Sequence, residues 1–374
     1  MKETSKTFHI IGAGIAGLSC ARIIKQKYKN IKTIVYEGGD APGGRCFSYK
    51  FVKVDYSDLV DESFSYKDID LGKDLDNATH VIIGANKEMS KYVGANEWEK
   101  EIWFWNATND ELSKKLKPVM GHLLKSATNT KEELIARQII RKILQKTFPW
   151  TINKRKVYFS KHNLSQKIIN SLAAYADEIN YKCKLLKIET QFGRAAQLNF
   201  NNKSVELGAE DRVILALDNH GYCKLMGKKQ LPHNSIINIF YRTSQKIHLP
   251  NAANMIGIIN GIADWVFVDD DILGITISTV NDEFVSLSEL AKNVWQELDK
   301  LRGVNSAFVP PYKVYKHKYA TIAQDEITNS LRPMDASTKY PNVFIAGDWT
   351  MKDLPCCMET AVLSAKRAVK AAAK

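Results

Sequence analysis

The stretch Phe8-His9-Ile10-Ile11-Gly12-Ala13-Gly14-Ile15-Ala16-Gly17 is an apolar run followed at once by three glycines in G-x-G-x-x-G spacing. In a strand, turn and helix unit, Gly12 permits the tight turn, Gly14 lets the backbone approach a pyrophosphate, and Gly17 lets the helix pack on the strand. The N–H groups at the start of this helix, at Ile15 and Ala16, would face the anion. The stretch therefore predicts the start of a dinucleotide-binding domain.

A carboxylate stands at the expected distance from these glycines. The β-type run Thr33-Ile34-Val35-Tyr36 ends at Glu37, 20 residues after Gly17. An acidic residue in this place is typical of a side chain that binds a ribose hydroxyl pair. Because two anions would share one pocket, Glu37 also disfavours a 2′-phosphate, and therefore NADP, at this site.

A second glycine pair, Gly43-Gly44, follows and is directly succeeded by Arg45. It provides flexible backbone beside a guanidinium that could reach the same pyrophosphate. An ordinary NAD dehydrogenase has no need of this turn, whereas the longer FAD runs past it toward the isoalloxazine. The turn thus favours FAD as the cofactor, and the alternative is a plain surface turn with an exposed arginine.

The C-terminal part of the sequence completes the predicted site. Residues 342–348 read as a buried strand that ends in Gly347-Asp348, and residues 357–373 read as an Ala-rich helix. Gly347 would allow close approach, and Asp348 would accept a hydrogen bond from a ribityl hydroxyl. The helix would point its N-terminus, near Met358, at the flavin N1–C2=O edge and stabilise negative charge there by about 0.3–2 kcal/mol.

With these residues in place, the chain resembles the FAD-dependent amine oxidase and phytoene desaturase superfamily. Within it, the chain is most similar to the hydroxysqualene dehydroxylases, also called squalene-associated desaturases. The likeness is carried by four blocks: residues 43–48, residues 76–85, residues 318–323 with Arg332-Pro333, and residues 346–349 with Leu354-Pro355 and Glu359. The first and last blocks are common to the superfamily, and the middle two are more specific to the dehydroxylase group.

The resemblance implies an α/β fold with a glutathione-reductase-type, Rossmann-like FAD-binding domain. An interleaved α+β substrate domain, an antiparallel sheet with helices, would accompany it. The FAD domain is predicted to be discontinuous, over residues 1–58, 159–225 and 332–374, and the substrate domain covers residues 59–158 and 226–331. The resemblance also implies that the backbone of Leu185 lies against the adenine, although Leu185 also reads as a core residue.

The activity implied by the resemblance is reductive dehydroxylation of a hydrophobic isoprenoid, from hydroxysqualene to squalene. A flavin carries the hydride chemistry, so the protein needs to add an acid that protonates the departing oxygen. His80 is the first candidate because imidazole can donate a proton near neutral pH, and Asp76 could orient it or act as the acid itself. The alternative for His80 is a buried histidine that satisfies a neighbouring loop.

The sequence also departs from the dehydroxylase pattern and leaves rival functions open. Thr79 replaces the usual Gln before the histidine, Thr360 replaces the usual Gly after Glu359, and the segment between Trp98 and Tyr158 is shorter than in the family. A flavin amine oxidase is one rival, although Asn238 stands roughly where many members of that branch have a lysine near flavin N5. The others are a carotenoid-type desaturase or isomerase, and an FAD-binding subunit without turnover.

Composition limits the remaining functions. The chain has 374 residues, and no apolar run approaches the roughly 18–20 residues of a membrane span. The first predicted strand leaves no room for a signal peptide, so we expect a cytoplasmic protein. Six cysteines without metal-ligand spacing predict no metal site, and no basic block with interleaved aromatics indicates nucleic-acid binding. The net charge of +12 permits peripheral contact with an anionic membrane, where a triterpenoid would reside, or merely reflects a Lys-rich composition. The oligomeric state stays open.

Overall fold

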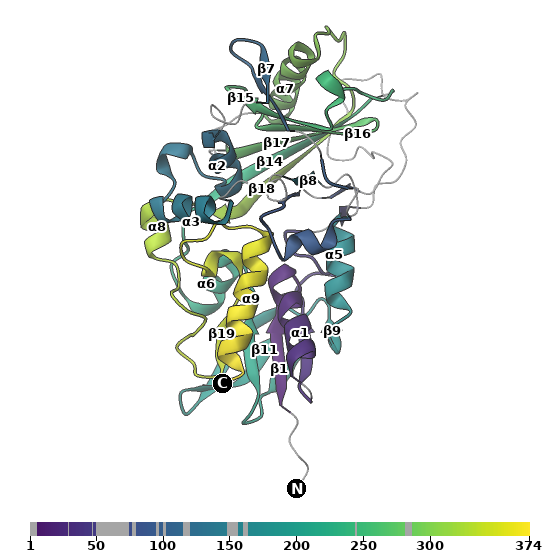
Figure 1. Ribbon diagram of the computed structural model, residues 1–374. Coiled ribbons are helices and arrows are strands. Elements are labelled where there is room, and N and C mark those ends of the chain that lie inside the picture. Colours follow the sequence, from purple (N-terminus) through teal and green to yellow (C-terminus); the bar gives the residue numbers. More distant parts are fainter. Residues whose placement is uncertain are drawn as a thin grey trace.

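Two sheets lie one above the other along the long axis of the molecule (Figure 1). In this computed structural model the described residues are 6–28, 30–46, 48–49, 75–76, 80–94, 97–99, 102–114, 120–147, 156–159, 164–243, 245–280 and 286–374. A parallel sheet with its helices forms the lower half, where the C-terminal helix ends. A larger sheet with a different set of helices forms the upper half.

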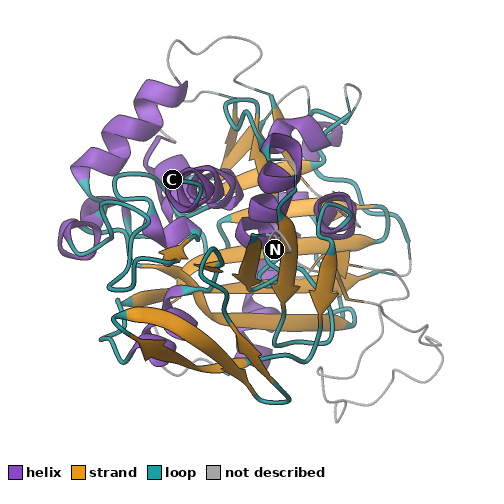
Figure 2. Ribbon diagram, turned by 90° about the horizontal axis from the view of Figure 1, so that it is seen from below, coloured by secondary structure: helices purple, strands orange, loops and turns teal. Residues whose placement is uncertain are grey.

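The lower sheet has five parallel strands in the order β19-β13-β1-β2-β9. These are β1 (Thr7–Ile11), β2 (Lys32–Tyr36), β9 (Glu178–Asn180), β13 (Arg212–Leu215) and β19 (Val343–Ile345). Helices α1 (Ile15–Lys27), α5 (Leu164–Ala173) and α9 (Met358–Ala372) cover one face. An antiparallel sheet of β10 (Leu185–Gln191), β11 (Arg194–Phe200) and β12 (Ser204–Glu206) covers the other (Figure 2). This layering is that of the predicted Rossmann-like domain.

The alternation of side chains along β1 produces these layers. Phe8 and Ile10 belong to the core under the helices, whereas Ile11 belongs to the core on the three-stranded side. Small residues let α1 and α9 lie close together, and the Cys20 Sγ atom is 4.0 Å from the carbonyl oxygen of Ala365. The Ala-rich composition of α9 is therefore a packing requirement at the centre of this domain.

The upper sheet has seven strands in the order β18-β14-β17-β16-β15-β6-β7. Its strands are β6 (Trp103–Asn106), β7 (Glu111–Ser113), β14 (His233–Arg242), β15 (Met255–Ile259), β16 (Trp265–Asp269), β17 (Ile272–Val280) and β18 (Tyr312–Ile322). The predicted antiparallel sheet is only partly right, because β6 pairs with β15 in parallel. The earlier segment of the chain thus adds its hairpin to the side of a sheet built by the later segment. Helix α7 (Leu287–Arg302) covers one face through an apolar core.

Shorter elements connect the two halves. They are β3 (Ser48–Tyr49), β4 (Leu75–Asp76), β5 (Val81–Ile83), η2 (Met89–Tyr92), α2 (Met120–Thr128), η4 (Glu132–Leu134), α3 (Arg137–Thr147), β8 (Val157–Phe159), α6 (Asn219–Met226), η5 (Pro250–Ala252), α8 (Glu326–Ser330) and η6 (Asp348–Thr350). Apolar residues recur at helical spacing over 132–146, and this stretch forms η4 and α3, separated by buried Ile135 and Ala136. They also recur at helical spacing over 164–179, but the helix α5 ends at Ala173 and the strand β9 begins at Glu178.

The two sheets take their strands from different stretches of the chain. All strands of the parallel sheet and the three-stranded sheet lie in 1–58, 159–225 or 332–374, and all strands of the seven-stranded sheet lie in 59–158 or 226–331. The predicted boundary at 158/159 lies inside β8, and the one at 58/59 lies outside the described residues. Thr79 also lies outside them. The chain therefore crosses between the halves repeatedly, and a cofactor bound to one half would meet the sheet of the other.

Candidate active site

The first glycine loop is fixed by backbone packing at the end of β1. Gly12 has a φ of +107°, and its N–H donates to the carbonyl oxygen of Tyr36 at 2.8 Å. A Cβ atom on Gly17 would lie 1.9 Å from the carbonyl oxygen of Gly12, and a Cβ on Gly12 would lie 2.6 Å from that of Ala216. Both positions therefore require glycine for the strand, turn and helix to meet.

The second glycine loop lies directly beside the first. The N–H of Gly43 donates to the carbonyl oxygen of Ala13 at 2.9 Å, and Gly14 and Gly43 form a parallel bridge. Gly43 and Gly44 have φ values of +129° and +61°, in the region that favours glycine. Gly14 caps α1 without a side-chain hydrogen bond, and the first turn of α1 has no acidic residue. Bare N–H groups beside two glycine loops fit the pyrophosphate of a dinucleotide.

Glu37 joins the two glycine loops. Its Oε2 atom accepts the N–H of Ala13 at 2.8 Å, and its Oε1 atom accepts the N–H of Gly39 at 2.8 Å. Each carboxylate oxygen keeps a further lone pair with which it could bind a ribose hydroxyl. Leu185 begins β10 nearby, since the N–H of Cys183 donates to the carbonyl oxygen of Glu37 at 2.7 Å. The predicted adenosine-binding residues are thus brought together around the end of β2.

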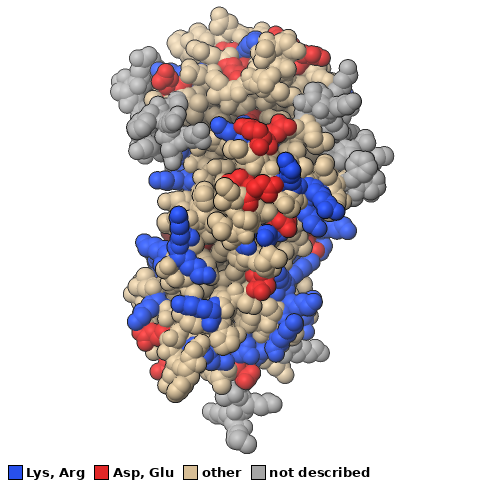
Figure 3. Space-filling view, turned by 90° about the vertical axis from the view of Figure 1, so that its left-hand side faces the viewer, with Lys and Arg blue, Asp and Glu red and all other residues tan. Residues whose placement is uncertain are grey.

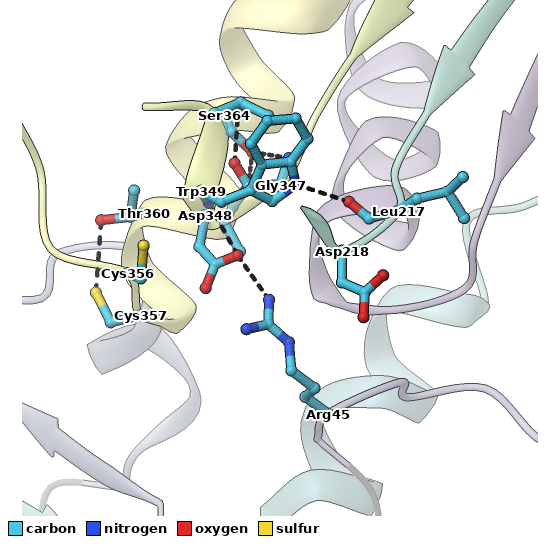
Figure 4. A network of polar contacts seen from close by, with 12 residues as sticks. Arg45, Leu217, Asp218, Gly347, Asp348, Trp349, Cys356, Cys357, Thr360 and Ser364 are labelled. Carbon is cyan, nitrogen blue, oxygen red and sulfur yellow. Dashed lines mark hydrogen bonds and ion pairs between the residues drawn. The ribbon is translucent and has the colours of Figure 1, made fainter. Parts of the chain in front are cut away.

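Arg45 and Asp348 form an ion pair across the predicted cofactor site (Figure 4). The Arg45 Nη2 atom is 2.6 Å from Asp348 Oδ1, and its Nη1 atom donates to the carbonyl oxygen of Ala320 at 2.7 Å. Asp348 is nearly buried, whereas the Arg45 side chain is 43% exposed. The predictions assigned Arg45 to a pyrophosphate and Asp348 to a ribityl hydroxyl. The structure places both residues at one point, where they also bind each other.

The turn after β19 is held by hydrogen bonds from several directions. Gly347 has a φ of +139°, and its N–H donates to Ser364 Oγ on α9 at 2.8 Å. The indole N–H of Trp349 donates to the carbonyl oxygen of Leu217 at 2.9 Å. Buried Arg332 donates to the carbonyl oxygens of Asp348 and Trp349, both at 2.9 Å. This network fixes Asp348, and Arg332, whose only signal in the sequence is the family resemblance, is one of its centres.

The start of α9 is also free of a side-chain cap. Cys357 is the N-cap residue with no side-chain hydrogen bond to the helix backbone, and Met358 is the first helical residue. Glu359 points elsewhere: it is 7% exposed, and its Oε2 atom accepts the N–H groups of Glu88 and Met89 at 2.9 and 3.0 Å. Burial raises the pKa of Glu359. Glu359 thus fastens η2 to α9, a role that no local pattern in the sequence indicates.

His80 and Asp76 lie together at the junction of the two halves. The His80 Nδ1 atom is 3.7 Å from Asp76 Oδ2, and both side chains are largely buried. Burial alone would lower the pKa of His80, but Cys46 and Asp76 outweigh it and raise this pKa well above its ordinary value. Cys46 was not predicted. It reaches the pair because β3 pairs with β4, which sets Ser48 opposite Asp76, a contact between positions far apart in the sequence.

An aromatic face of the seven-stranded sheet is turned toward this junction. Phe104, Trp265 and Phe267 form a core with Val157 of β8. Because β8 pairs with β5, which follows His80 directly, this core is continuous with the His80 region. Phe104, Trp265 and Phe267 are buried, and they give the seven-stranded sheet an aromatic, strongly apolar wall where it packs on β8.

Among the described residues, no group of three or more His, Cys, Asp or Glu could hold a metal ion, and no helix is long and apolar enough to cross a membrane. All six cysteines are free thiols. The site that the structure assembles therefore consists of two glycine loops, two uncapped helix starts, an Arg–Asp pair and a buried histidine.

Comparison with known proteins gives a consistent result. Residues 84–373 match the family described as flavin containing amine oxidoreductase, and residues 10–91 match the NAD(P)-binding Rossmann-like domain. The chain is similar to hydroxysqualene dehydroxylase of Rhodopseudomonas palustris, with 24% identity over 432 residues and 97% of each chain covered. The hydroxysqualene dehydroxylase of Zymomonas mobilis is 24% identical over 426 residues, which cover 96% of this chain and 97% of the relative.

Solved structures share the fold. An oxidoreductase from Methanosarcina mazei has a TM-score of 0.69 at 13% identity, covering 97% of this chain and 100% of its own. Putrescine oxidase bound to putrescine has a TM-score of 0.60 at 11% identity, covering 98% of each chain. At these identities the likeness concerns the fold alone.

Proposed function

The chain belongs to the family of flavin-containing amine oxidoreductases, and on this premise we propose that it reductively dehydroxylates an isoprenoid alcohol, converting hydroxysqualene to squalene. It is an FAD-dependent oxidoreductase with a Rossmann-like domain. The substrate proposal is carried by the similarity to three hydroxysqualene dehydroxylases, each at 22–24% identity over 96–97% of this chain. A buried acid candidate beside an apolar wall supports it.

The residues that would hold the cofactor have separate roles in this proposal. Together they are called the cofactor cradle: the two glycine loops, Glu37, Arg45, Asp348 and the starts of α1 and α9. Gly14, Gly43 and the start of α1 would hold the pyrophosphate, and Glu37 would hold the ribose. Arg45 and Asp348 would bind the cofactor between these loops and α9, whose uncapped start near Met358 would stabilise negative charge on it. When bound there in its reduced form, FAD would supply the hydride and be left oxidised.

His80 would supply the proton. Hydroxide is a poor leaving group, so the hydroxyl oxygen must be protonated as its bond to carbon breaks. With hydride added to the carbon and a proton from His80 added to the oxygen, the products are the hydrocarbon and water. Cys46 and Asp76 raise the pKa of His80 well above its ordinary value, which favours the protonated imidazole that this role requires.

A surface beside α8 offers a place for peripheral contact with the membrane that would hold the substrate. Ile327 on α8 and Leu331 and Met334, which follow this helix, are 75%, 64% and 76% exposed. They lie beside α3, whose first N–H donates to Glu326, and α3 carries Arg137, Arg141, Lys142 and Lys146 without an acidic residue. Figure 3 looks at this side of the molecule, where basic side chains are spread with acidic ones among them. We include contact with an anionic bilayer in the proposal because apolar side chains near cations suit such a surface.

A direct experiment separates this function from its rivals. The purified protein is loaded with FAD, reduced without oxygen and mixed with hydroxysqualene while its visible spectrum is recorded. We expect the flavin to reoxidise and squalene to appear in equal amount by mass spectrometry. Oxidised enzyme mixed with putrescine or phytoene tests amine oxidation and polyene desaturation.

The controls decide between the readings. Squalene itself should leave the reduced flavin unchanged, since it has no hydroxyl to remove. If hydroxysqualene leaves the flavin reduced while an amine or a polyene reduces the oxidised enzyme, the dehydroxylation proposal is wrong. Bound flavin that responds to none of these compounds would instead favour the subunit without turnover.

A further inference from the structure

One row of residues crosses the seven-stranded sheet on the face away from α7. Directly paired residues of antiparallel strands share a face, so the register sets Tyr315, Asn238, Thr276 and Trp265 side by side on β18, β14, β17 and β16. The neighbouring residues Ile237 and Ile239 of β14 belong to the apolar core on the α7 side. The row therefore faces away from α7, toward the aromatic wall.

Asn238 is the polar centre of this row. Its side chain is completely buried, and its Oδ1 atom accepts a hydrogen bond from Thr276 Oγ1 at 3.0 Å. The Nδ2 atom has no hydrogen-bond partner among the residues that the structure describes, even though it is shielded from water. A buried amide donor without a partner is costly in a folded protein, so it calls for an explanation, and a role toward a bound group at a redox or catalytic site is one. Thr276 orients the amide so that the donor is the free end.

The same wall holds a second buried polar atom without a partner. His122 of α2 lies against it, with its ring centroid 5.2 Å from that of Trp265 and 6.3 Å from that of Phe104. Within the described part of the chain, its Nε2 atom has no hydrogen-bond partner. Gly257 leaves room for these rings, since a Cβ there would lie 2.6 Å from Phe104 Cδ1. The wall is thus aromatic with isolated polar points, which suits a long hydrocarbon carrying a single polar group.

The row is connected to the cofactor cradle through β18. Arg45, the partner of Asp348, donates to the carbonyl oxygen of Ala320 on this strand. On the same strand, Tyr315 precedes Ala320 by five residues, a separation of about 16 Å along an extended strand. Tyr315 is the residue of β18 that pairs with Asn238. Asn238 therefore lies on the sheet that runs from the cradle along the site.

We propose that Asn238 donates its free side-chain N–H to a hydrogen-bond acceptor at the redox centre and that Thr276 orients it for this purpose. The acceptor is an uncharged oxygen or nitrogen that arrives with a ligand, either the hydroxyl oxygen of the substrate or a ring atom of the flavin. As a neutral donor, Asn238 would position this atom, while proton delivery remains with His80. The substrate arm of this inference rests on the proposed function, and the flavin arm does not.

The test compares Asn238→Leu and Thr276→Val with the wild-type holoenzyme. Leucine keeps the volume without the donor, and valine keeps Asn238 but removes the hydroxyl that orients it. Ile237→Val, on the opposite face of the same strand, is the matched control. For each protein we would measure FAD content, thermal unfolding, the visible spectrum, the flavin reduction potential, and kcat and KM for hydroxysqualene.

If the acceptor is the substrate oxygen, both variants should lose at least tenfold in kcat/KM while the flavin spectrum and potential stay unchanged. If it is a flavin atom, Asn238→Leu should shift the spectrum and the potential even without substrate. Thermal and FAD measurements exclude misfolding, and Thr276→Val provides the test if Asn238→Leu does not fold. Variants that match the wild type in every readout would overturn the inference. If the wild-type enzyme does not dehydroxylate hydroxysqualene, the proposed function is wrong. The visible spectrum and the flavin reduction potential alone then decide whether Asn238 binds the flavin ring.

Discussion

The cofactor cradle and the junction around His80 are built in different ways. The cradle is made of backbone: glycines, helix starts and carbonyl groups that lie close in sequence to the strands that place them. At the junction, side chains meet from separate segments, with Cys46, Asp76 and His80 joined only through short strand pairings. A backbone site tolerates many side chains but no change of glycine geometry, whereas a side-chain site can lose its chemistry while the fold survives.

Gly17→Ala should therefore have the largest effect, because it disturbs both the fold and the cofactor. Its Cβ would lie 1.9 Å from the carbonyl oxygen of Gly12, so α1 must move off β1 at a cost of about 3 kcal/mol. We expect a lower unfolding temperature and loss of bound FAD. Gly14→Ala is the control, because its nearest neighbour would be 3.7 Å away. That variant should fold and yet bind FAD weakly, since the methyl group obstructs the pyrophosphate. Equal unfolding temperatures for the two variants would contradict the packing role of Gly17.

His80→Ala should show the opposite behaviour. The fold and the FAD content should remain near wild type, because His80 is not part of the cradle. Squalene formation should fall by about 10²–10⁴-fold, the usual contribution of a positioned acid. His220→Ala is a matched control: this half-buried histidine bonds to Gln230 at 2.8 Å and stacks on Tyr319. If single-turnover rates of the two variants are alike, His80 is a packing residue.

How far the sequence predicts each region follows from the same contrast. The two glycine turns, Glu37 and the Gly347-Asp348 turn could be predicted because local spacing determines where each lies. His80 and Asp76 were found together because one short block contains both. Cys46, the cap that Glu359 provides for η2, and the unpaired amide of Asn238 depend on pairings between distant segments. No periodicity in a single sequence reports such contacts. The parallel pairing of β6 with β15 was missed for this reason as well.

The pH dependence tests the chemistry of the junction. Cys46 and Asp76 raise the pKa of His80, so the acid form should persist above the ordinary value of about 6.5. Activity that needs the protonated imidazole should be full at lower pH and fall as the pH rises through this raised pKa. The stability that protonation contributes should be lost over the same range. The Cys46→Ala variant lacks one cause of the raised pKa, so its activity should begin to fall at a lower pH than that of the wild type. At a fixed pH where activity is falling, the variant should be about tenfold less active, which corresponds to a shift of about one pKa unit. An unmoved limb in the kcat profile would separate Cys46 from His80.

The smallest expected effect concerns the outer surface, where neither backbone geometry nor a buried cluster is at stake. Leu331→Glu with Met334→Glu should weaken sedimentation with vesicles of phosphatidylcholine and phosphatidylglycerol, because it removes apolar area and adds negative charge beside α3. The loss should be several-fold. Binding by the wild type should fall with added salt, because at 0.1 M ionic strength exposed charges are screened beyond a Debye length of about 10 Å.

Phe192→Glu is the control, because Phe192 is 98% exposed in the turn between β10 and β11. With detergent-dispersed substrate both variants should turn over like the wild type, because the change concerns where the enzyme meets its substrate and leaves the site intact. Equal vesicle binding by all three proteins would remove this surface from the proposal and leave the catalytic junction untouched.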